Sequence, residues 1–291
     1  MNDYLVIGID KKENFRAYAA VTDKILEEAR RRHDTSATAS AALGRTLTAG
    51  VLMSANLKGD DLLTIRVMGD GPIGGMVVTA DAEANVRGYV ENPHADLPSK
   101  NDKLDVGGLV GHSGQLSVTK NMGLKDPYTG SINLVSGEIG EDVAFYYARS
   151  EQIPSVVALG VLVETDLSIK AAGGFLVQAM PGTEEGALLE LEQRVCSLPS
   201  VSQLYSEGIP PEQILQQLLG GNFVELQRKP VAFKCRCSKE KLEKILISLG
   251  EAEIKDIINT QGKAEVKCHF CGDTYHFETD ELEQLLASAK E

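Results

Sequence analysis

The chain has 291 residues, a formal net charge of −13 at pH 7 and a pI near 4.9. Because this charge repels phosphate backbones, we do not expect nucleic acid as a partner. The sequence has neither a basic, apolar leader nor an uninterrupted apolar stretch of about eighteen residues, so we expect a cytoplasmic protein without a membrane partner.

The N-terminal part of the chain combines short strands with two helices. Apolar alternation and turn residues predict strands at residues 4–9, 15–21, 62–68, 75–80 and 86–91. Residues 23–33 are predicted to form a helix, in which acidic residues precede basic ones. A second helix is predicted from about residue 35 to about residue 57, with Asp34 or Thr35 as its N-cap. It is rich in Ala and Gly, so we expect it to be buried against a sheet or another helix.

A glycine-rich segment at residues 69–74 matches the G-x-G-x-x-G pattern of dinucleotide-binding sites. That pattern needs a helix directly after it, whereas a strand follows here and Pro72 interrupts the loop, so a strand connection is favoured. His94 and His112 lie in a loop-rich stretch without a neighbouring nucleophile, and we interpret them as surface residues. Because no acid–base or nucleophile set is clustered in this part of the chain, we do not expect an enzyme.

Residues up to about 180 complete a core domain. Further strands are predicted at residues 116–120, 132–135, 156–163 and 169–178. A helix that opens near Ser136 is predicted to run to about Gln152, where Pro154 ends it. The last two strands form a strongly apolar hairpin, which we expect at the centre of a sheet. The fold class predicted for residues 1–180 is therefore α+β, a mixed core of sheet and helix.

The composition changes after residue 180, and residues 181–230 predict a helical linker. Its helices are predicted at residues 184–198, 200–207 and 211–219. Helices of this length are marginal by themselves and need a surface to pack on. Cys196 lies in the first of them, and we expect it to be a buried helix residue without a redox role.

Residues 231–291 predict a small C-terminal module. Strands are predicted at residues 231–235, 264–267 and 274–277, and helices at residues 239–249 and 251–259. Asp280 and Glu283 have the spacing of a capping box, so a final helix is expected to begin there.

Four of the five cysteines form two tight pairs in this module, Cys235 with Cys237 and Cys268 with Cys271. Two such pairs, brought together by a fold, supply four thiolates, the closed tetrahedral ligand set of a structural zinc site. Gly272 follows the second pair and allows a turn with positive φ, in which backbone N–H groups point at the sulfurs. The spacing therefore predicts one zinc ion with four cysteine ligands.

The residues around the cysteine pairs add no further ligand to this prediction. His269 and His276 are interpreted as bystanders, because four sulfurs already fill the coordination shell. From residue 231 to residue 291 there are nine Lys plus Arg against twelve Asp plus Glu, which again argues against nucleic acid.

Three functions are compatible with such a set. It can be the inert zinc site of a constitutive protein-interaction adaptor, or a dithiol oxidoreductase centre, although such motifs usually open a helix in a βαβ unit. It can also bind metal and sense oxidants together. A module of this size is marginal by itself, whereas structural zinc contributes on the order of 10–16 kcal/mol. In the third case, oxidation would remove the zinc and unfold the module.

Several motifs outside the cysteines resemble the core of one protein family. They are TASAALGRT at 38–46, GDGPIG at 69–74, VSGEIGED at 135–142, SEQIPS at 150–155, and Gly173-Gly-Phe followed by Gln178. Together with the C-x-C and C-x-x-C pairs, these motifs make the chain similar to the heat shock protein 33 family of bacterial redox-regulated chaperones. The resemblance covers nearly the whole chain.

The resemblance implies an ATP-independent holdase that is inactive while it is reduced and zinc-bound. Oxidation would form the disulfides Cys235–Cys237 and Cys268–Cys271, release the zinc, and unfold the module and the linker. The newly exposed apolar surface would bind unfolding client proteins under oxidative stress, and the active form would be a homodimer. The implied fold is an α+β core, a helical linker and a zinc module.

Overall fold

A computed structural model describes residues 2–12 and 14–288 of the chain. The chain divides into two compact units, Met1–Lys234 and Cys235–Glu291, here called the large unit and the small unit. Both contain helices and strands, so the predicted α+β class is confirmed. None of the helices formed by the described residues is long and apolar enough to cross a bilayer.

The large unit contains two mainly antiparallel sheets. The first sheet has the order β10-β1-β2-β9-β8, with β1 at Tyr4–Asp10, β2 at Phe15–Val21, β8 at Ser155–Val163, β9 at Ile169–Ala179 and β10 at Phe223–Pro230. The second has the order β11-β5-β4-β3-β6-β7, with β3 at Leu62–Met68, β4 at Gly75–Asp81, β5 at Asn85–Val90, β6 at Gln115–Asn121, β7 at Tyr128–Asn133 and β11 at Ala232–Phe233.

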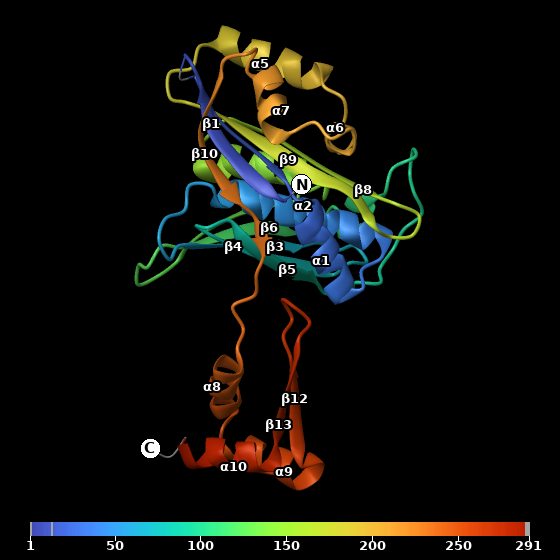
Figure 1. Cartoon of the computed structure of the whole chain (residues 1–291), viewed down its shortest axis with the longest axis vertical. Coiled ribbons are helices and arrows are strands. Elements are labelled where there is room, and N and C mark those ends of the chain that lie inside the picture. The colour runs from blue at the N-terminus through green and yellow to red at the C-terminus, as the bar shows by residue number, and fades with distance from the viewer. Residues whose placement is uncertain (1, 13, 289–291) are drawn as a thin grey trace. The chain divides into compact units, whose positions relative to one another are not determined.

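Helix α2, at Ala37–Ser54, lies between the two sheets (Figure 1). Nearly all of its side chains are buried, which confirms the packing expected from its small residues. Its N-cap is Ser36, whose hydroxyl accepts a bond from the Ala39 amide at 3.2 Å, so the prediction of Asp34 or Thr35 was wrong. Asp34 instead ends helix α1, Asp23–His33, in a left-handed conformation.

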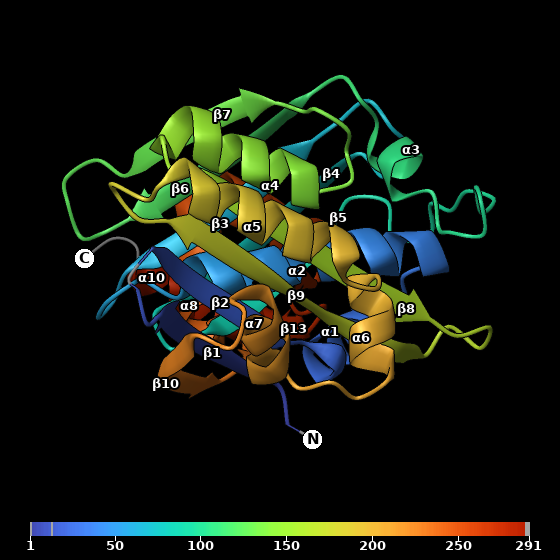
Figure 2. The ribbon, with the colours of Figure 1, turned by 90° about the horizontal axis from the view of Figure 1, so that it is seen from above.

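Three linker helices cover the outer face of the first sheet (Figure 2). They are α5 at Glu185–Ser197, α6 at Val201–Ser206 and α7 at Pro211–Leu218. Helix α7 buries Ile214, Leu215 and Leu218, and the Tyr205 hydroxyl of α6 donates a bond to the Gly174 carbonyl at 3.1 Å. Helix α5 is held more weakly, because Leu191 is its one buried residue.

The linker is not helical throughout. Residues 223–230 form β10, an outer strand paired with β1, where a helical linker was predicted. The hairpin at 156–178 was predicted at the centre of a sheet. Of its two strands, however, only β9 is paired on both sides, whereas β8 is an edge strand. The strand predicted at 231–235 is confined to β11, which pairs in parallel with β5. These three differences share one cause. Strand pairing joins residues that are far apart in the sequence, and local sequence patterns do not reveal which strands pair.

Smaller differences concern the segment from residue 106 to residue 151. A short helix α3, Val106–Val110, lies in the stretch predicted as loop, and β7 begins earlier than predicted. Helix α4, Gly140–Tyr146, continues as a π-helical turn, Tyr147–Glu151. It begins after Ser136 because the buried Asp142 carboxylate accepts the Val135, Ser136 and Ile139 amides and keeps them in a loop.

The described residues of the small unit, 235–288, form three helices and one hairpin. Its elements are α8 at Lys239–Leu249, α9 at Glu251–Gln261, β12 at Lys263–Lys267, β13 at Thr274–Glu278 and α10 at Thr279–Ser288. Its buried apolar cluster consists of Leu242, Leu246, Ile254, Ala264, Phe277 and Leu282. The predicted pair Asp280 and Glu283 is offset, because α10 begins at Thr279 and the Glu281 carboxylate accepts the Glu278 amide.

Candidate metal centre

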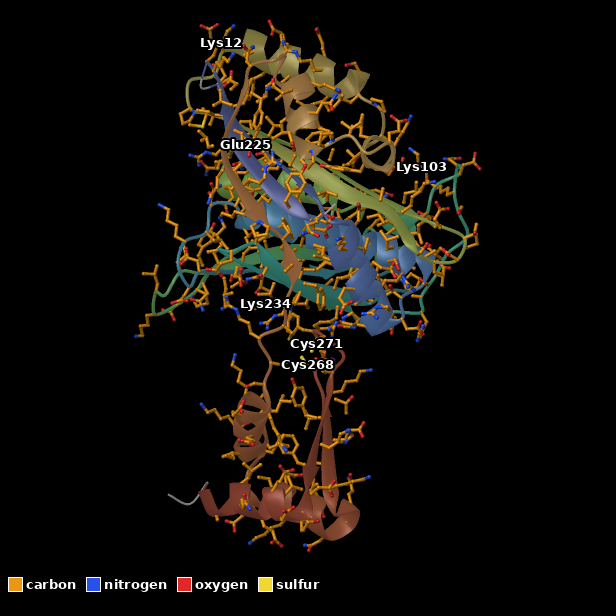
Figure 3. All side chains as sticks on the ribbon, in the orientation of Figure 1. Lys12, Lys103, Glu225, Lys234, Cys268 and Cys271 are labelled. Atoms are coloured by element: carbon orange, nitrogen blue, oxygen red, sulfur yellow. The ribbon has the colours of Figure 1, made fainter. Side chains whose placement is uncertain are left out.

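The four paired cysteines come from two segments of the small unit. Cys235 and Cys237 precede α8, whereas Cys268 and Cys271 lie in the connection between β12 and β13. Figure 3 labels Cys268 and Cys271 next to each other at the tip of this hairpin. The β12–β13 pairing, with Lys267 opposite Thr274, brings the two ends of the second cysteine segment together.

The backbone of the second pair forms a tight turn. The Gly272 amide donates to the Cys268 carbonyl at 2.8 Å, and the Cys268 amide donates to the Asp273 carbonyl at 2.9 Å. Gly272 has a φ of 73°, a conformation that glycine adopts without steric cost. The positive φ predicted at this glycine is therefore confirmed.

The sulfur atoms form one compact cluster. The Cys235 and Cys268 sulfurs are 3.7 Å apart, those of Cys237 and Cys271 are 3.4 Å apart, and all four lie within 4.8 Å of one another. Four sulfurs at about 2.3 Å from a central zinc ion would be separated by about 3.8 Å. The donor set and its spacing thus fit a tetrahedral ion of that kind. None of these four cysteines is joined in a disulfide in this arrangement.

Electrostatics also favour a cation at the centre of the cluster. Burial raises the pKa of the Cys271 thiol. At Cys235 the burial penalty is outweighed by hydrogen bonds from the Cys237 amide and from neighbouring thiols, which lower the pKa to about 7. Four thiolates cannot lie this close together without a positive charge to offset their repulsion. A divalent ion would supply that charge and keep all four sulfurs deprotonated.

One functional neighbour was missed by reasoning from the sequence. The Tyr275 hydroxyl lies 3.2 Å from the Cys237 sulfur, within hydrogen-bonding distance. Tyr275 lies on β13, after the second cysteine pair. It contacts Cys237 of the first pair because the fold brings the two cysteine segments together. The sequence contains no local signal for this contact.

The remaining candidates lie outside the sulfur cluster. The group that can hold an ion among the described residues contains neither His269 nor His276. His276 instead faces Glu265 across the hairpin, with 3.6 Å between Nδ1 and a carboxylate oxygen. Cys196 is exposed on α5, so the prediction of a buried residue was wrong. The apolar stripe of α5 faces the sheet through Leu191, and Cys196 lies off that stripe.

The centre and the fold define a class of protein, a two-unit α+β chain with a four-cysteine C-terminal unit. The family model described as Hsp33 protein matches residues 3–278. A 33 kDa chaperonin of Geobacillus kaustophilus is 52% identical over 100% of this chain and 99% of the relative. Another from Desulforamulus reducens is 49% identical over 100% of this chain and 99% of its own length.

A solved structure gives the same result. The 33 kDa chaperonin of Thermotoga maritima, described as a heat shock protein 33 homologue, has a TM-score of 0.93 and 36% sequence identity, and 99% of each chain is covered. The chain therefore belongs to the Hsp33 family of chaperones, as its motifs predicted.

Proposed function

We propose that this protein is an ATP-independent holdase whose activity is switched on by oxidation of the four cysteines. In this proposal residues 1–180 form the core, residues 181–230 the linker and residues 231–291 the redox switch. The reduced chain holds one zinc ion through Cys235, Cys237, Cys268 and Cys271 and is inactive. The single observation that carries the proposal is the cluster of four sulfurs in a unit with a very small apolar core.

The stability of the small unit supports a switch. A domain of this size buries about 60% of its unfolded surface and is only marginally stable without a bound metal ion or a disulfide. Structural zinc supplies on the order of 10–16 kcal/mol of apparent binding free energy, more than the ~5 kcal/mol expected for the net stability of so small a unit. Loss of the ion would therefore unfold the small unit.

The chemistry of the switch follows from the ligands. We propose that Cys235 joins Cys237 and that Cys268 joins Cys271. Each disulfide takes the two thiolate sulfurs, and their two electrons reduce one peroxide molecule, which with two protons becomes two water molecules. Disulfide sulfurs are no longer thiolate ligands, so zinc leaves. All sulfur pairs lie within 4.8 Å in the reduced centre, so the final pairing depends on how the chain moves once zinc has left.

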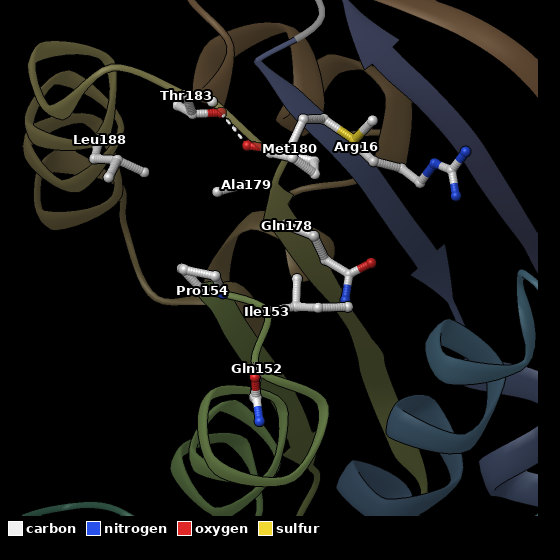
Figure 4. Close-up of a pocket in the computed structure, with 11 residues that line it drawn as sticks. Arg16, Gln152, Ile153, Pro154, Gln178, Ala179, Met180, Thr183 and Leu188 are labelled. Atoms are coloured by element: carbon white, nitrogen blue, oxygen red, sulfur yellow. Dashed lines mark hydrogen bonds between the residues drawn. The ribbon is translucent and has the colours of Figure 1, made fainter.

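The client surface in this proposal is the apolar outer face of the first sheet. Helices α5–α7 cover it, and α5 covers it loosely, since a hollow of about 480 Å³ lies between α5 and the ends of β8 and β9. In Figure 4, Ile153, Pro154, Met180 and Leu188 surround this hollow, and the Thr183 hydroxyl donates to the Met180 carbonyl. In this proposal, unfolding of the small unit, which follows β10 and β11 directly in the chain, loosens these strands and the linker before them, and the helices then leave the sheet.

The partners follow from this surface. Unfolding client proteins expose apolar segments, and an uncovered apolar sheet face binds them without nucleotide hydrolysis. A second copy of the active chain would cover part of the same surface, so we propose a homodimer after activation. A reducing cytoplasm would keep the centre in its thiolate form until an oxidant arrives.

The deciding experiment follows zinc content, free thiols and suppression of client aggregation in one sample before and after peroxide. We expect zinc release and disulfide formation to precede the rise in chaperone activity. Cys196→Ser is the matched control, because it removes the exposed cysteine and leaves the centre intact. It should switch like the wild type.

The same experiment separates the alternatives. Full suppression of aggregation while zinc stays bound would contradict the switch and favour a constitutive zinc-dependent adaptor. Turnover of a disulfide substrate by the reduced chain would favour a dithiol oxidoreductase. Mass spectrometry of the oxidised chain would identify the two disulfides directly.

A further inference from the structure

The outer strand β10 protects one edge of the first sheet, where it pairs with β1 (Figure 1). It contributes little to the core: Phe223 is buried, whereas Val224 and Leu226 are 37% and 59% exposed. Strand β1, in contrast, buries Leu5 in one hydrophobic cluster and Val6 in the other. Removal of β10 would therefore cost little apolar burial and would leave β1 in place as a new edge.

The backbone pairing shows what this edge offers. The Val231 amide donates to the Asp3 carbonyl at 3.1 Å. Because ladder bonds in an antiparallel pair recur at every second residue, the Lys229 amide faces β1 and the Arg228 amide faces away. Pro230 occupies another position that faces away, where its missing N–H is not needed. An uncovered β1 would thus present a row of unpaired donors and acceptors.

Two side chains of β10 mark subsites along this edge. The Phe223 ring lies on Gly8, where a β-carbon would come within 2.3 Å of the ring, so the absence of a side chain at Gly8 creates the space. At the other end, the Arg228 guanidinium lies 4.7 Å from the centre of the Tyr4 ring, a cation–π contact. The edge accepts an aromatic residue at one end and a basic residue at the other.

The place of β10 in the chain links it to the redox centre. It is the last linker element before β11, after which Cys235 begins the small unit. A linker that loosens when the small unit unfolds would therefore release β10 along with the helices. This step rests on the proposed function above.

We propose that the edge of β1, once β10 has left it, is a client-binding site that captures an extended segment as an added strand. The preferred segment has a large apolar or aromatic residue and a basic residue at the spacing of Phe223 and Arg228. Unfolding proteins supply extended chain with unsatisfied backbone groups, and main-chain pairing binds it with little demand on sequence. The net charge of −13 adds a general attraction for basic segments.

A synthetic peptide with the sequence of residues 222–231, NFVELQRKPV, tests the site on the full-length chain. Fluorescence anisotropy should detect its binding to the oxidised, zinc-free chain and at least tenfold weaker binding to the reduced, zinc-loaded chain. N-methylation at the lysine that corresponds to Lys229 should weaken binding at least tenfold. N-methylation at the arginine that corresponds to Arg228 is the matched control and should change binding less than threefold.

A second peptide maps the site. With benzoylphenylalanine in place of the phenylalanine that corresponds to Phe223, irradiation should label β1 around Gly8. Adducts on another segment, or equal effects of the two N-methyl groups, would overturn the proposal. Absence of peptide binding to an oxidised sample that suppresses client aggregation would overturn it too and would leave the chaperone function standing. An oxidised sample that fails in both assays would refute the proposed function itself.

Discussion

The large unit buries a continuous aliphatic core between two sheets and α2, whereas the small unit buries a few apolar side chains and gathers four sulfurs at one end. The first arrangement spreads stability over many contacts, each worth a kilocalorie or two. In the second, under the proposed function, most of the stability would come from one metal centre, whose thiolate ligands an oxidant can change. Under the proposed function, one chain thereby combines a unit stabilised by a broad apolar core with a unit whose folding would depend on one metal centre.

Zinc removal should give the largest difference between the two units. A strong chelator under reducing conditions should abolish amide-exchange protection throughout residues 235–288, because about 10–16 kcal/mol of binding free energy is lost. Protection in β2 and β9 should remain, since their stability comes from the aliphatic core. A small unit that stays protected after verified zinc removal would show that its apolar core suffices.

A matched pair of cavity substitutions sharpens the comparison. Phe277 in the small unit and Phe175 in the large unit are both buried, and Phe→Ala at such sites costs about 3–5 kcal/mol. We expect Phe277→Ala to weaken zinc retention and to make the small unit sensitive to protease even when reduced. Phe175→Ala should lower the melting temperature of a large unit that stays folded. If limited proteolysis shows that both units stay equally resistant after their substitutions, the two units do not differ in how much their folding depends on the apolar core.

The large unit carries a pH-dependent weakness of its own. Burial raises the pKa of Asp3 to about 6, although its carboxylate accepts the Ile25 and Lys24 amides. Because the raised pKa belongs to the folded state, Asp3 stays protonated there at low pH and is penalised when it ionises. The free energy of unfolding of the large unit should therefore fall by about 2–3 kcal/mol between pH 4 and pH 7.

Urea unfolding of the wild type and of Asp3→Asn measures this effect. The difference between the two proteins should change in that pH range and be constant above pH 7. A constant difference from pH 4 to pH 7 would mean that the carboxylate titrates alike in both states.

The smallest effect is expected at the edge of the metal centre. Tyr275→Phe removes the hydroxyl next to the Cys237 sulfur and should lower zinc affinity about tenfold, as lost outer hydrogen bonds typically do. Competition with a chromophoric chelator measures this change. Tyr128→Phe, at an exposed position of the large unit, is the control and should leave the affinity unchanged. If the Tyr275→Phe protein binds zinc with wild-type affinity, the Tyr275 hydroxyl does not contribute to metal binding.

Local patterns were sufficient for much of the fold. The helices Asp23–His33 and Lys239–Leu249 have the predicted bounds, because charge order, capping and apolar period act within a few turns. The cysteine cluster was predictable for the same reason, since each pair presents two sulfurs by its spacing alone. The turn at Gly272 likewise depends only on the conformational freedom of glycine.

Other features depended on contacts between distant segments. The assignment of residues 223–230 to a strand, the edge position of β8 and the contact between Tyr275 and Cys237 were decided by pairing and packing across the chain. Cys196 was misplaced because a weak apolar stripe does not determine which face of α5 meets the sheet. The sequence by itself thus determined most of the helices and strands and the four-thiol composition of the candidate metal centre. The tertiary structure alone decided which strand protects which edge, because hydrogen-bond partners in a sheet are chosen by proximity in space.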